Sequence, residues 1–365
     1  MTQSVRKMMK RVLCLIESIG SGGSERQLTG LAVMLKQQGC RVEVCYYFNQ
    51  EFYLPYLQEN GVESCFLAEA SNPKKRFFAL RKHIKAFKPD TVISYSTSPG
   101  MITCLLKLFG AEFNLIVSER NTTQQMDFRE RLKFLLYRWA DHIVPNSQSQ
   151  ASFISRHFPG LSRKVKVITN FVDTEKFSPA TEELPGHEVT EMVCVGRLTP
   201  QKNLPRFIEA IGRVAGDGYR IRVDWYGQSF DSGYREECDK AIVNHHLEDV
   251  FVFHAPSPNI QDEYRRADLF CLPSLYEGFP NVLCEAMSCG KPVLCSRVCD
   301  NPHIVSEGEN GYMFDPLDVG EMASTIEHYL DLDRGKREKM GVRSREMALE
   351  MFSEQIFIQK YISII

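Results

Sequence analysis

Residues 274–290 read Ser274-Leu-Tyr-Glu-Gly-Phe-Pro-Asn-Val-Leu-Cys-Glu-Ala-Met-Ser-Cys-Gly290. The segment follows an apolar run, Ala267-Asp-Leu-Phe-Cys-Leu272, that predicts a buried β-strand. Pro280 and Asn281 suit the first turn of a helix and Gly290 suits its end, so we expect a short helix over 281–289. A strand, a loop and a short helix therefore follow one another here.

Two carboxylates and an anion site are expected in this segment. Glu277 falls in the predicted loop, and Glu285 falls near the start of the predicted helix. The loop is expected to aim the free N–H groups of Phe279, Asn281 and Val282 outward, at the positive end of the helix dipole, where anions bind. Such a site suits a ligand that joins hydroxyls to phosphates, as a nucleotide-sugar does.

The length and the charge of the chain predict two domains. At 365 residues the chain is too long for one ordinary core. Residues 1–165 hold 23 Lys and Arg against 13 Asp and Glu, a net of +10, whereas the rest holds 21 against 33, a net of −12. This asymmetry indicates two units with different partners. The basic half could face an anionic membrane or a phosphorylated acceptor, or it could be a surface without a partner.

The twelve cysteines indicate a reduced protein without a metal site. Most of them lie in apolar runs, where a thiol behaves as a small hydrophobic group. No pair has the Cys-x2-Cys spacing, so we expect no zinc site, and a reducing cytoplasm is the simplest location. The first apolar stretch, Val12–Ile16, is too short for a signal peptide or a membrane-spanning helix.

Apolar runs that alternate with helical patterns predict two successive α/β halves. Strands are expected at 12–16, 41–48, 91–95, 115–118, 142–145 and 164–168, and then at 192–198, 221–226, 250–253, 269–273 and 292–296. We therefore predict an N-terminal domain over 1–170, a linker over 171–190 and a C-terminal domain over 191–349. A C-terminal helix over about 350–365 could pack back on the first domain.

Two stretches combine basic residues with apolar ones at helical spacing. They are Lys74–Lys88, with seven basic residues, and Phe128–Trp139. A basic amphipathic helix can lie on an anionic lipid surface. The same pattern also fits an ordinary surface helix whose apolar stripe faces its own sheet, and the sequence leaves both interpretations open.

Several motifs together resemble those of one enzyme family. They are Gly22-Gly-Ser-Glu25, Asn170-x-x-Asp-x-x-x-Phe177, Val195-Gly-Arg-Leu-x-x-x-Lys-Asn203, Ser274-x-x-Glu-Gly-Phe-Pro-x-x-x-x-Glu-Ala-Met-x-x-Gly-x-Pro292 and Gly308-x-x-Gly311. The chain resembles the retaining glycosyltransferases of family 4. That resemblance implies the α/β GT-B fold, with two facing Rossmann-like domains, parallel sheets and an interdomain cleft. It is strongest for members that build bacterial surface polysaccharides, such as lipopolysaccharide or capsule, and lipid-linked oligosaccharides.

The resemblance also implies an activity and a set of site residues. A hexose or N-acetylhexosamine is expected to pass from a nucleotide-diphosphate sugar, with UDP favoured, to a saccharide or lipid-linked acceptor, with retention and without a metal or other cofactor. Arg197 and Lys202 are expected to grip the diphosphate and to stabilise the charge that grows on the leaving phosphate. Glu277 lies near the sugar hydroxyls and Glu285 holds the ribose in the family. The remaining residues of the predicted donor site are Gly22, Gly23, Gly278, Phe279, Pro280, Asn281 and Val282.

The chain departs from the family pattern at two places. Many relatives have a His where this chain reads Ser118-Glu-Arg-Asn121, so Ser118, Arg120 and Asn121 are candidates for sugar or acceptor contacts. Gln228 and Ala255 replace glycines where the nucleotide base would sit.

Two other functional classes fit parts of the same pattern. A GT-B-type nucleotide-sugar epimerase is one alternative, which the paired glutamates disfavour, and a non-catalytic sugar-nucleotide-binding protein is another. No motif for nucleic-acid binding is present. We expect a cytoplasmic enzyme, with contact to the inner face of the membrane through its basic half left open.

Overall fold

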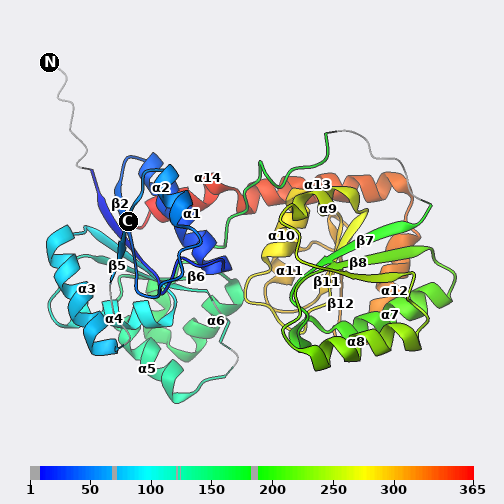
Figure 1. The fold of residues 1–365 in the computed structure, drawn as a ribbon, viewed down its shortest axis with the longest axis horizontal. Coiled ribbons are helices and arrows are strands. Elements are labelled where there is room, and N and C mark those ends of the chain that lie inside the picture. Colours follow the sequence, from blue (N-terminus) through cyan, green and yellow to red (C-terminus); the bar gives the residue numbers. More distant parts are fainter. Residues whose placement is uncertain (1–8, 68–71, 121, 124, 182–187) are drawn as a thin grey trace. The chain divides into compact units, whose positions relative to one another are not determined.

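The computed structural model describes residues 9–67, 72–120, 122–123, 125–181 and 188–365. The chain forms two compact units (Figure 1). Unit 1 runs to Asn170 and also includes Phe357–Ile365, and unit 2 is Phe171–Ile356.

Unit 1 is built on a six-stranded parallel sheet. Its strands lie in the order β3-β2-β1-β4-β5-β6, the order of the nucleotide-binding doubly wound fold. Their bounds are β1 Arg11–Leu15, β2 Arg41–Tyr46, β3 Glu63–Phe66, β4 Thr91–Tyr95, β5 Asn114–Glu119 and β6 His142–Pro145. The helices of this unit are α1 Gly23–Gln37, α2 Leu54–Glu59, α3 Pro73–Phe87, α4 Thr97–Leu108, α5 Phe128–Leu136 and α6 Gln148–His157, with short 3-10 turns η1 Tyr137–Trp139 and η2 Pro159–Lys164.

Unit 2 repeats the same topology. Its parallel strands lie in the order β12-β11-β10-β7-β8-β9, which is the order of unit 1 when the strands are counted from β7. The strands are β7 Thr190–Val195, β8 Ile221–Tyr226, β9 Phe251–His254, β10 Leu269–Leu272, β11 Val293–Ser296 and β12 Gly311–Phe314. The helices are η3 Pro200–Lys202, α7 Leu204–Gly216, α8 Ser232–Asn244, α9 Ile260–Arg266, α10 Asn281–Ser288, α11 Asn301–Ile304, α12 Val319–Leu330 and α13 Arg334–Phe352, and α14 Glu354–Ile362 follows. The predicted fold class is confirmed, since the chain has two Rossmann-like domains.

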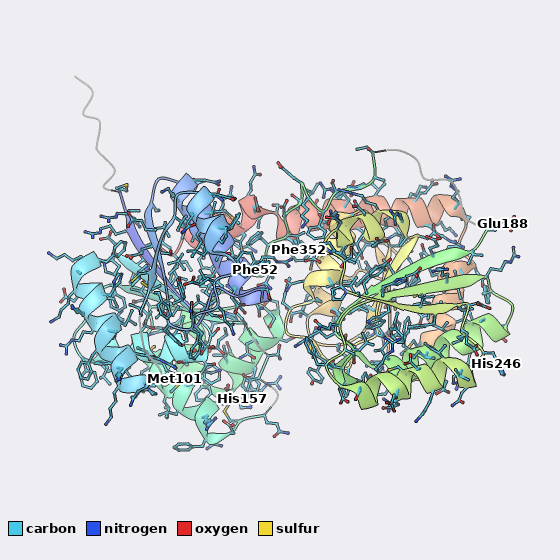
Figure 2. All side chains as sticks on the ribbon, in the orientation of Figure 1. Phe52, Met101, His157, Glu188, His246 and Phe352 are labelled. Atoms are coloured by element: carbon cyan, nitrogen blue, oxygen red, sulfur yellow. The ribbon has the colours of Figure 1, made fainter. Side chains whose placement is uncertain are left out.

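Each sheet is covered by helices on both faces, and its central strands are therefore mostly apolar. In unit 1, Leu13, Val92 and Leu115 are fully buried in one core cluster. In unit 2, Trp225 and Phe270 lie in two separate clusters, one on each face of the sheet. Side chains fill the space between each sheet and its helices (Figure 2).

The structure differs from the predicted strands at three places. Strands β3 and β12 were not predicted, and both are four-residue strands at the edge of their sheet; the side chains of β3 are also half-exposed. The strand predicted over 164–168 is wrong. That segment contacts the sheet edge through an isolated bridge between Val165 and Ile143 and does not form a strand.

The last helices connect the two units in sequence. The main-chain N–H of Val172 donates to the carbonyl of Phe352, the last residue of α13, so the start of the predicted linker packs on unit 2. Arg345 of α13 donates to the carbonyl of Phe177 at 2.9 Å, which fixes this segment further. Tyr361 of α14 belongs to unit 1 and is fully buried there.

Candidate active site

The predicted donor residues of unit 2 lie at the point where the strand order of its sheet reverses. Strands β7 and β10 are neighbours there, with Phe270 opposite Val193. Ligands of doubly wound sheets bind beyond the carboxyl ends of the strands at such a point. The loops after these strands, 196–203 and 273–280, are joined by hydrogen bonds between Gln201 and the main chain of Leu275 and Tyr276, each 2.8 Å long.

Lys202 and Glu277 form an ion pair in this site. The Nζ atom of Lys202 lies 2.6 Å from Oε1 of Glu277, and the two side chains are 12% and 9% exposed. The pair joins the β7 loop to the β10 loop. Because the pair retains some exposure, an anionic ligand can reach the ammonium group and share it with the carboxylate.

Two glycines lie at close contacts beside the lysine. A Cβ atom on Gly196 would lie 2.8 Å from Cε of Lys202, so a larger residue there would push the end of the lysine side chain aside. A Cβ atom on Gly227 would lie 1.9 Å from the carbonyl oxygen of Gly196. The ends of β7 and β8 therefore approach each other closely, and this approach requires a glycine at position 227.

Asn203 positions Lys202 and was not assigned a role from the sequence. It has φ 59°, a left-handed conformation that asparagine tolerates better than most residues. Its side chain is buried, and Nδ2 donates to the carbonyls of Pro273 at 3.2 Å and Pro316 at 2.7 Å. The asparagine thus fixes the turn between η3 and α7 to the start of the β10 loop. An asparagine directly before a helix was the available signal.

Arg197 differs from Lys202 in its surroundings. It is exposed, and within the part of the chain that the structure describes it forms no ion pair. The two cations leave the same strand end five positions apart, as predicted. At the switch point Lys202 is a positive charge held by Glu277, and Arg197 is an exposed positive charge.

Glu285 lies in the second turn of α10 and is 5% exposed. The hydroxyl of Tyr264 lies 3.4 Å from its Oε2 atom. A nearly buried carboxylate needs hydrogen-bond donors, and hydroxyl groups of a ligand can supply further ones. Glu277 and Glu285 therefore lie at opposite ends of the segment 277–285, one in the loop and one in the helix.

The predicted set of free amides is wrong at one position. The N–H of Asn281 donates to the carbonyl of Phe279 at 2.9 Å, because the chain makes a tight turn at Pro280 before α10 begins. The N–H groups of Phe279 and Val282 have no hydrogen-bond partner within the described residues. The ring of Phe279 is buried against Phe352, with centroids 5.8 Å apart, so Phe279 offers only its main chain to a ligand.

The loop after β11 supports Glu277 from behind. The main-chain N–H of Glu277 donates to Sγ of Cys299 at 3.4 Å, and Cys299 has φ 49°. Burial raises the pKa of the Cys299 thiol, so a neutral sulfur faces the glutamate. Ser274 is fully buried at the start of the β10 loop, and within the described residues its hydroxyl has no hydrogen-bond partner. Ser274 begins the family motif but was assigned no role, and no sequence signal pointed to Cys299.

A cavity of about 530 Å³ opens beside this site, at the carboxyl ends of β8 and β9. It is lined by Gly227, Gln228, Ser229, Arg235, Phe253, His254, Ala255 and Pro256. Gln228 and Ala255, the two departures from the family pattern, both line it. The ring of His254 stacks on Tyr226 with centroids 4.6 Å apart, and its Nε2 atom lies 2.6 Å from Asp224. The pKa of Asp224 is lowered: burial alone would raise it, but hydrogen bonds from Arg222 and His254 outweigh that effect.

The predicted residues of unit 1 have different surroundings. Gly22 and Gly23 are exposed at the N-terminus of the fifteen-residue helix α1, where the carboxylate of Glu25 reaches back over Gly22. Asn121 lies outside the described residues.

Ser118 and Arg120 are buried in unit 1, which argues against their predicted contact with sugar or acceptor. The hydroxyl of Ser118 donates to the carbonyl of Val144 at 3.1 Å. Arg120 donates to Asn170 and to the hydroxyl of Tyr361, at 2.8 Å each, and its guanidinium lies 4.0 Å from the centroid of the Tyr95 ring. Arg120 thus holds α14 and the end of unit 1 on the sheet.

Comparison with known families covers both halves of the chain. The model of "Glycosyltransferase Family 4" matches residues 21–176, and that of "Glycosyl transferases group 1" matches residues 181–347. The chain belongs to the family 4 glycosyltransferases. This glycosyltransferase carries its donor-site candidates mainly in the second of the two matched regions.

Curated relatives of the glycosyltransferase match it over most of its length. The amylovoran biosynthesis glycosyltransferase AmsD of Erwinia amylovora is 25% identical over 84% of this chain and 86% of its own. A Campylobacter jejuni enzyme, N-acetylgalactosamine-N,N'-diacetylbacillosaminyl-diphospho-undecaprenol 4-alpha-N-acetylgalactosaminyltransferase, is 25% identical over 79% of this chain and 81% of its own.

A solved structure shares the fold of the glycosyltransferase. The Anabaena protein Alr3699/HepE, crystallised in complex with UDP, superposes with a TM-score of 0.85 over 97% of this chain and 99% of its own, at 18% identity. Among the described helices of the present chain, none is long and apolar enough to cross a membrane.

Proposed function

We propose that this glycosyltransferase moves a hexose or N-acetylhexosamine from a UDP-sugar to a saccharide or lipid-linked glycan, with retention at the anomeric carbon, in the synthesis of a surface polysaccharide. The observation that carries the proposal is the Lys202–Glu277 pair at the switch point of unit 2, with Arg197 beside it. A diphosphate and a sugar hydroxyl need this combination of cation and carboxylate.

The cations stabilise the departing nucleotide. Negative charge grows on the β-phosphate as the bond to the sugar breaks, and preorganised cations near that oxygen lower the barrier. Lys202 is held in place by Glu277, so little reorganisation is needed when the phosphate arrives. Arg197 can close on the diphosphate with two parallel hydrogen bonds. With two cations and the N-terminus of α10 at the phosphates, this reaction needs no metal ion at the donor.

The two glutamates accept hydrogen bonds from hydroxyl groups of the donor. In this proposal Glu285 accepts from the ribose and Glu277 from the transferred sugar. The contact of Glu277 with Lys202 supports a sugar position close to the diphosphate. Retention requires the acceptor to attack from the face that the nucleotide leaves. A phosphate oxygen then takes the proton of the acceptor hydroxyl, so no glutamate nucleophile is required, in contrast to a retaining glycosidase.

The relatives support the choice of donor and acceptor. One relative is named for an N-acetylgalactosaminyl transfer to an undecaprenol-linked diphosphate, and another for amylovoran biosynthesis. The solved structure of the same fold contains UDP. These names favour a UDP-linked donor and a glycan acceptor on a lipid diphosphate.

A panel of UDP-, GDP- and ADP-sugars tests the proposal. We expect nucleotide release from one UDP-sugar, and a lipid-diphosphate-linked saccharide should stimulate it. With an α-linked donor, NMR of the product should show an α-anomeric configuration. Activity should persist after exhaustive treatment with EDTA. An epimerised nucleotide-sugar formed without acceptor, or donor binding without any turnover, would contradict a transferase.

We further propose that α5 brings the enzyme to the membrane that carries its acceptor. Four apolar side chains on and after this helix are exposed, namely Phe128 by 79%, Leu132 by 41%, Leu135 by 52% and Trp139 by 41%. Arg129, Arg131 and Arg138 are exposed among them. An apolar face bordered by arginines fits the interface of an anionic bilayer. The other basic stretch, on α3, buries Leu80, Ile84 and Phe87 against unit 1 and is an ordinary surface helix apart from Phe78.

Vesicle sedimentation tests this surface. Wild-type protein should sediment with vesicles that contain phosphatidylglycerol and not with pure phosphatidylcholine, and the Leu132→Ser/Leu135→Ser variant should lose most of that binding. The matched control is Val342→Ser/Leu349→Ser, which changes two exposed apolar residues of α13. Equal binding by both variants would exclude α5 as the membrane contact.

A further inference from the structure

A group of side chains of metal-binding types lies in unit 1, and none of them is among the predicted donor residues. Glu43 and Cys45 are two residues apart on β2, so their side chains point to the same face of the sheet. Cys65 on β3 is the register partner of Cys45. His83 comes from α3, which covers this edge of the sheet. The group comes from three separate segments, which the parallel pairing of β2 with β3 and the packing of α3 bring together.

Their ligand atoms are close enough to surround one ion. One atom from each residue lies within 4.8 Å of the others. Nδ1 of His83 is 3.8 Å from Sγ of Cys65. A tetrahedral zinc ion with bonds of about 2.3 Å to sulfur and about 2.0 Å to nitrogen separates two such ligands by about 3.6 Å. A small movement of the side chains therefore completes the geometry.

The other nitrogen of His83 already has the partner that a metal-bound histidine requires. Nε2 lies 3.0 Å from Oε2 of Glu43. Metal-binding histidines almost always donate their second N–H to a carboxylate or carbonyl, which fixes the tautomer and turns the free nitrogen toward the ion. In this arrangement Glu43 orients the ring, and Nδ1 faces the sulfur side of the group.

We propose that Cys45, Cys65 and His83 bind one zinc ion, with Glu43 holding the imidazole in place. Thiolate and imidazole are the ligands that zinc prefers, and two thiolates select it over magnesium or calcium. The fourth position is filled by water, which can reach the site because the side chains of His83 and Glu43 are 20% and 12% exposed. The proposal is independent of the transferase reaction.

The ion would have a structural role. It would link α3 to β2 and to the edge strand β3, which is only four residues long and has half-exposed side chains. A short edge strand has few contacts of its own, so a bond to the covering helix would hold it in the sheet. None of these residues takes part in the proposed sugar transfer.

The test uses full-length protein freed of metal by a chelator and kept reduced. Zn²⁺ should bind with one equivalent per chain by calorimetry, and Co²⁺ should give the sulfur-to-cobalt charge-transfer absorption of a thiolate site. Cys65→Ser and His83→Gln should each abolish this stoichiometric binding. Glu43→Gln should weaken the affinity about 10–100-fold, as expected for a group that orients a ligand.

Matched controls separate the site from the other cysteines. Cys40→Ser and His157→Gln change a cysteine and a histidine of the same unit outside the group, and both should bind as the wild type does. Cys65→Ser replaces a half-buried residue, and its circular dichroism shows whether it is folded. Wild-type affinity in Cys65→Ser or His83→Gln, no uptake by the metal-free protein, or a Cys45–Cys65 disulfide in protein purified with zinc would each overturn the proposal.

Discussion

Lys202 has two partners in the proposed reaction. Glu277 contacts it before the donor binds, and the donor phosphate then shares the ammonium group with Glu277. In the structure its ammonium is held by Glu277 at 2.6 Å, with both side chains nearly buried. Removing the lysine leaves the carboxylate of Glu277 without its cation in a nearly buried site. The contact with the phosphate is then lost, and Glu277 is no longer held in position. The lysine and the glutamate thus act as one unit.

We expect Lys202→Ala to lower kcat/KM for the donor about 10²–10³-fold, the usual loss when one charge-stabilising group is removed. The enzyme should remain folded by circular dichroism. Initial rates of nucleotide release over a range of donor concentrations measure the effect, and Arg213→Ala, which removes an exposed cation of α7, is the control. Unchanged turnover in Lys202→Ala would remove this residue from the site.

Asn203 is the second residue on which the site depends. We expect Asn203→Gly to lose about 1–3 kcal/mol of unfolding free energy, because the carbonyls of Pro273 and Pro316 lose their amide donor while glycine tolerates the left-handed main chain. Denaturant unfolding measures this loss. The same variant should also lower turnover, since one of the hydrogen bonds that tie the β7 loop to the β10 loop is lost. A variant as stable and as active as the wild type would exclude this role.

Elements with a strong periodic signal were predicted, and those without one were missed. The central strands are continuous apolar runs, and β1, β4 and β10 were predicted for that reason. Strand β3 pairs at the sheet edge with half-exposed side chains, so no apolar run marks it. The segment over 164–168 donates two main-chain hydrogen bonds to β6, from Lys166 and Ile168, but it forms only one isolated bridge and so is not a strand. Sequence periodicity reports burial, and a strand also requires continuous ladder pairing.

The same limit applies to the candidate sites. The positions of Lys202 and Glu277 after their strands, and of Glu285 in the following helix, were predicted from spacing, and the structure brings the first two into contact. Arg120 was expected to be available to a ligand because it follows a strand, but Tyr95 and Tyr361 cover it. The group of Cys45, Cys65 and His83 has no sequence signature, since its members meet only through strand pairing and the docking of α3.

Helix α5 is anchored to the sheet of unit 1 by a buried ion pair. Lys133 lies 2.6 Å from Glu119 at the end of β5, with both side chains at most 4% exposed, and it also contacts Glu130. Lys133 is therefore a structural residue and does not belong to the basic surface of the helix. We expect Lys133→Ala to destabilise the protein by about 3–5 kcal/mol, because Glu119 is left charged and buried.

Thermal and denaturant unfolding measure this effect, with Arg131→Ala, which changes an exposed residue of the same helix, as the control. A double variant, Lys133→Met/Glu119→Gln, should recover part of the loss because it leaves no buried charge. Equal stability of Lys133→Ala and Arg131→Ala would mean that the pair contributes nothing.

At the scale of the whole molecule, the two units divide the chemistry between them. Each has its own six-stranded sheet and its own buried core. The predicted charge asymmetry follows the same division, with a basic unit 1 and an acidic unit 2. Most of the proposed donor residues lie in unit 2, whereas the proposed zinc site and the exposed face of α5 lie in unit 1. The proposed donor site and the proposed zinc site can therefore be tested separately, because UDP and zinc should protect different segments of the main chain from hydrogen exchange.

Hydrogen exchange with mass spectrometry provides that separation. Chelating the metal should speed exchange in β2, β3 and α3, which lose their common ligand, and leave the loops 196–203 and 273–280 unchanged. UDP should slow exchange in those two loops with or without the chelator, because bound ligand suppresses the opening of the segments it contacts. Cys65→Ser should exchange alike with and without chelator. If chelation instead weakened UDP protection and Mg²⁺ restored it, the donor site itself would require a metal, and the proposed metal-independent transfer would be wrong.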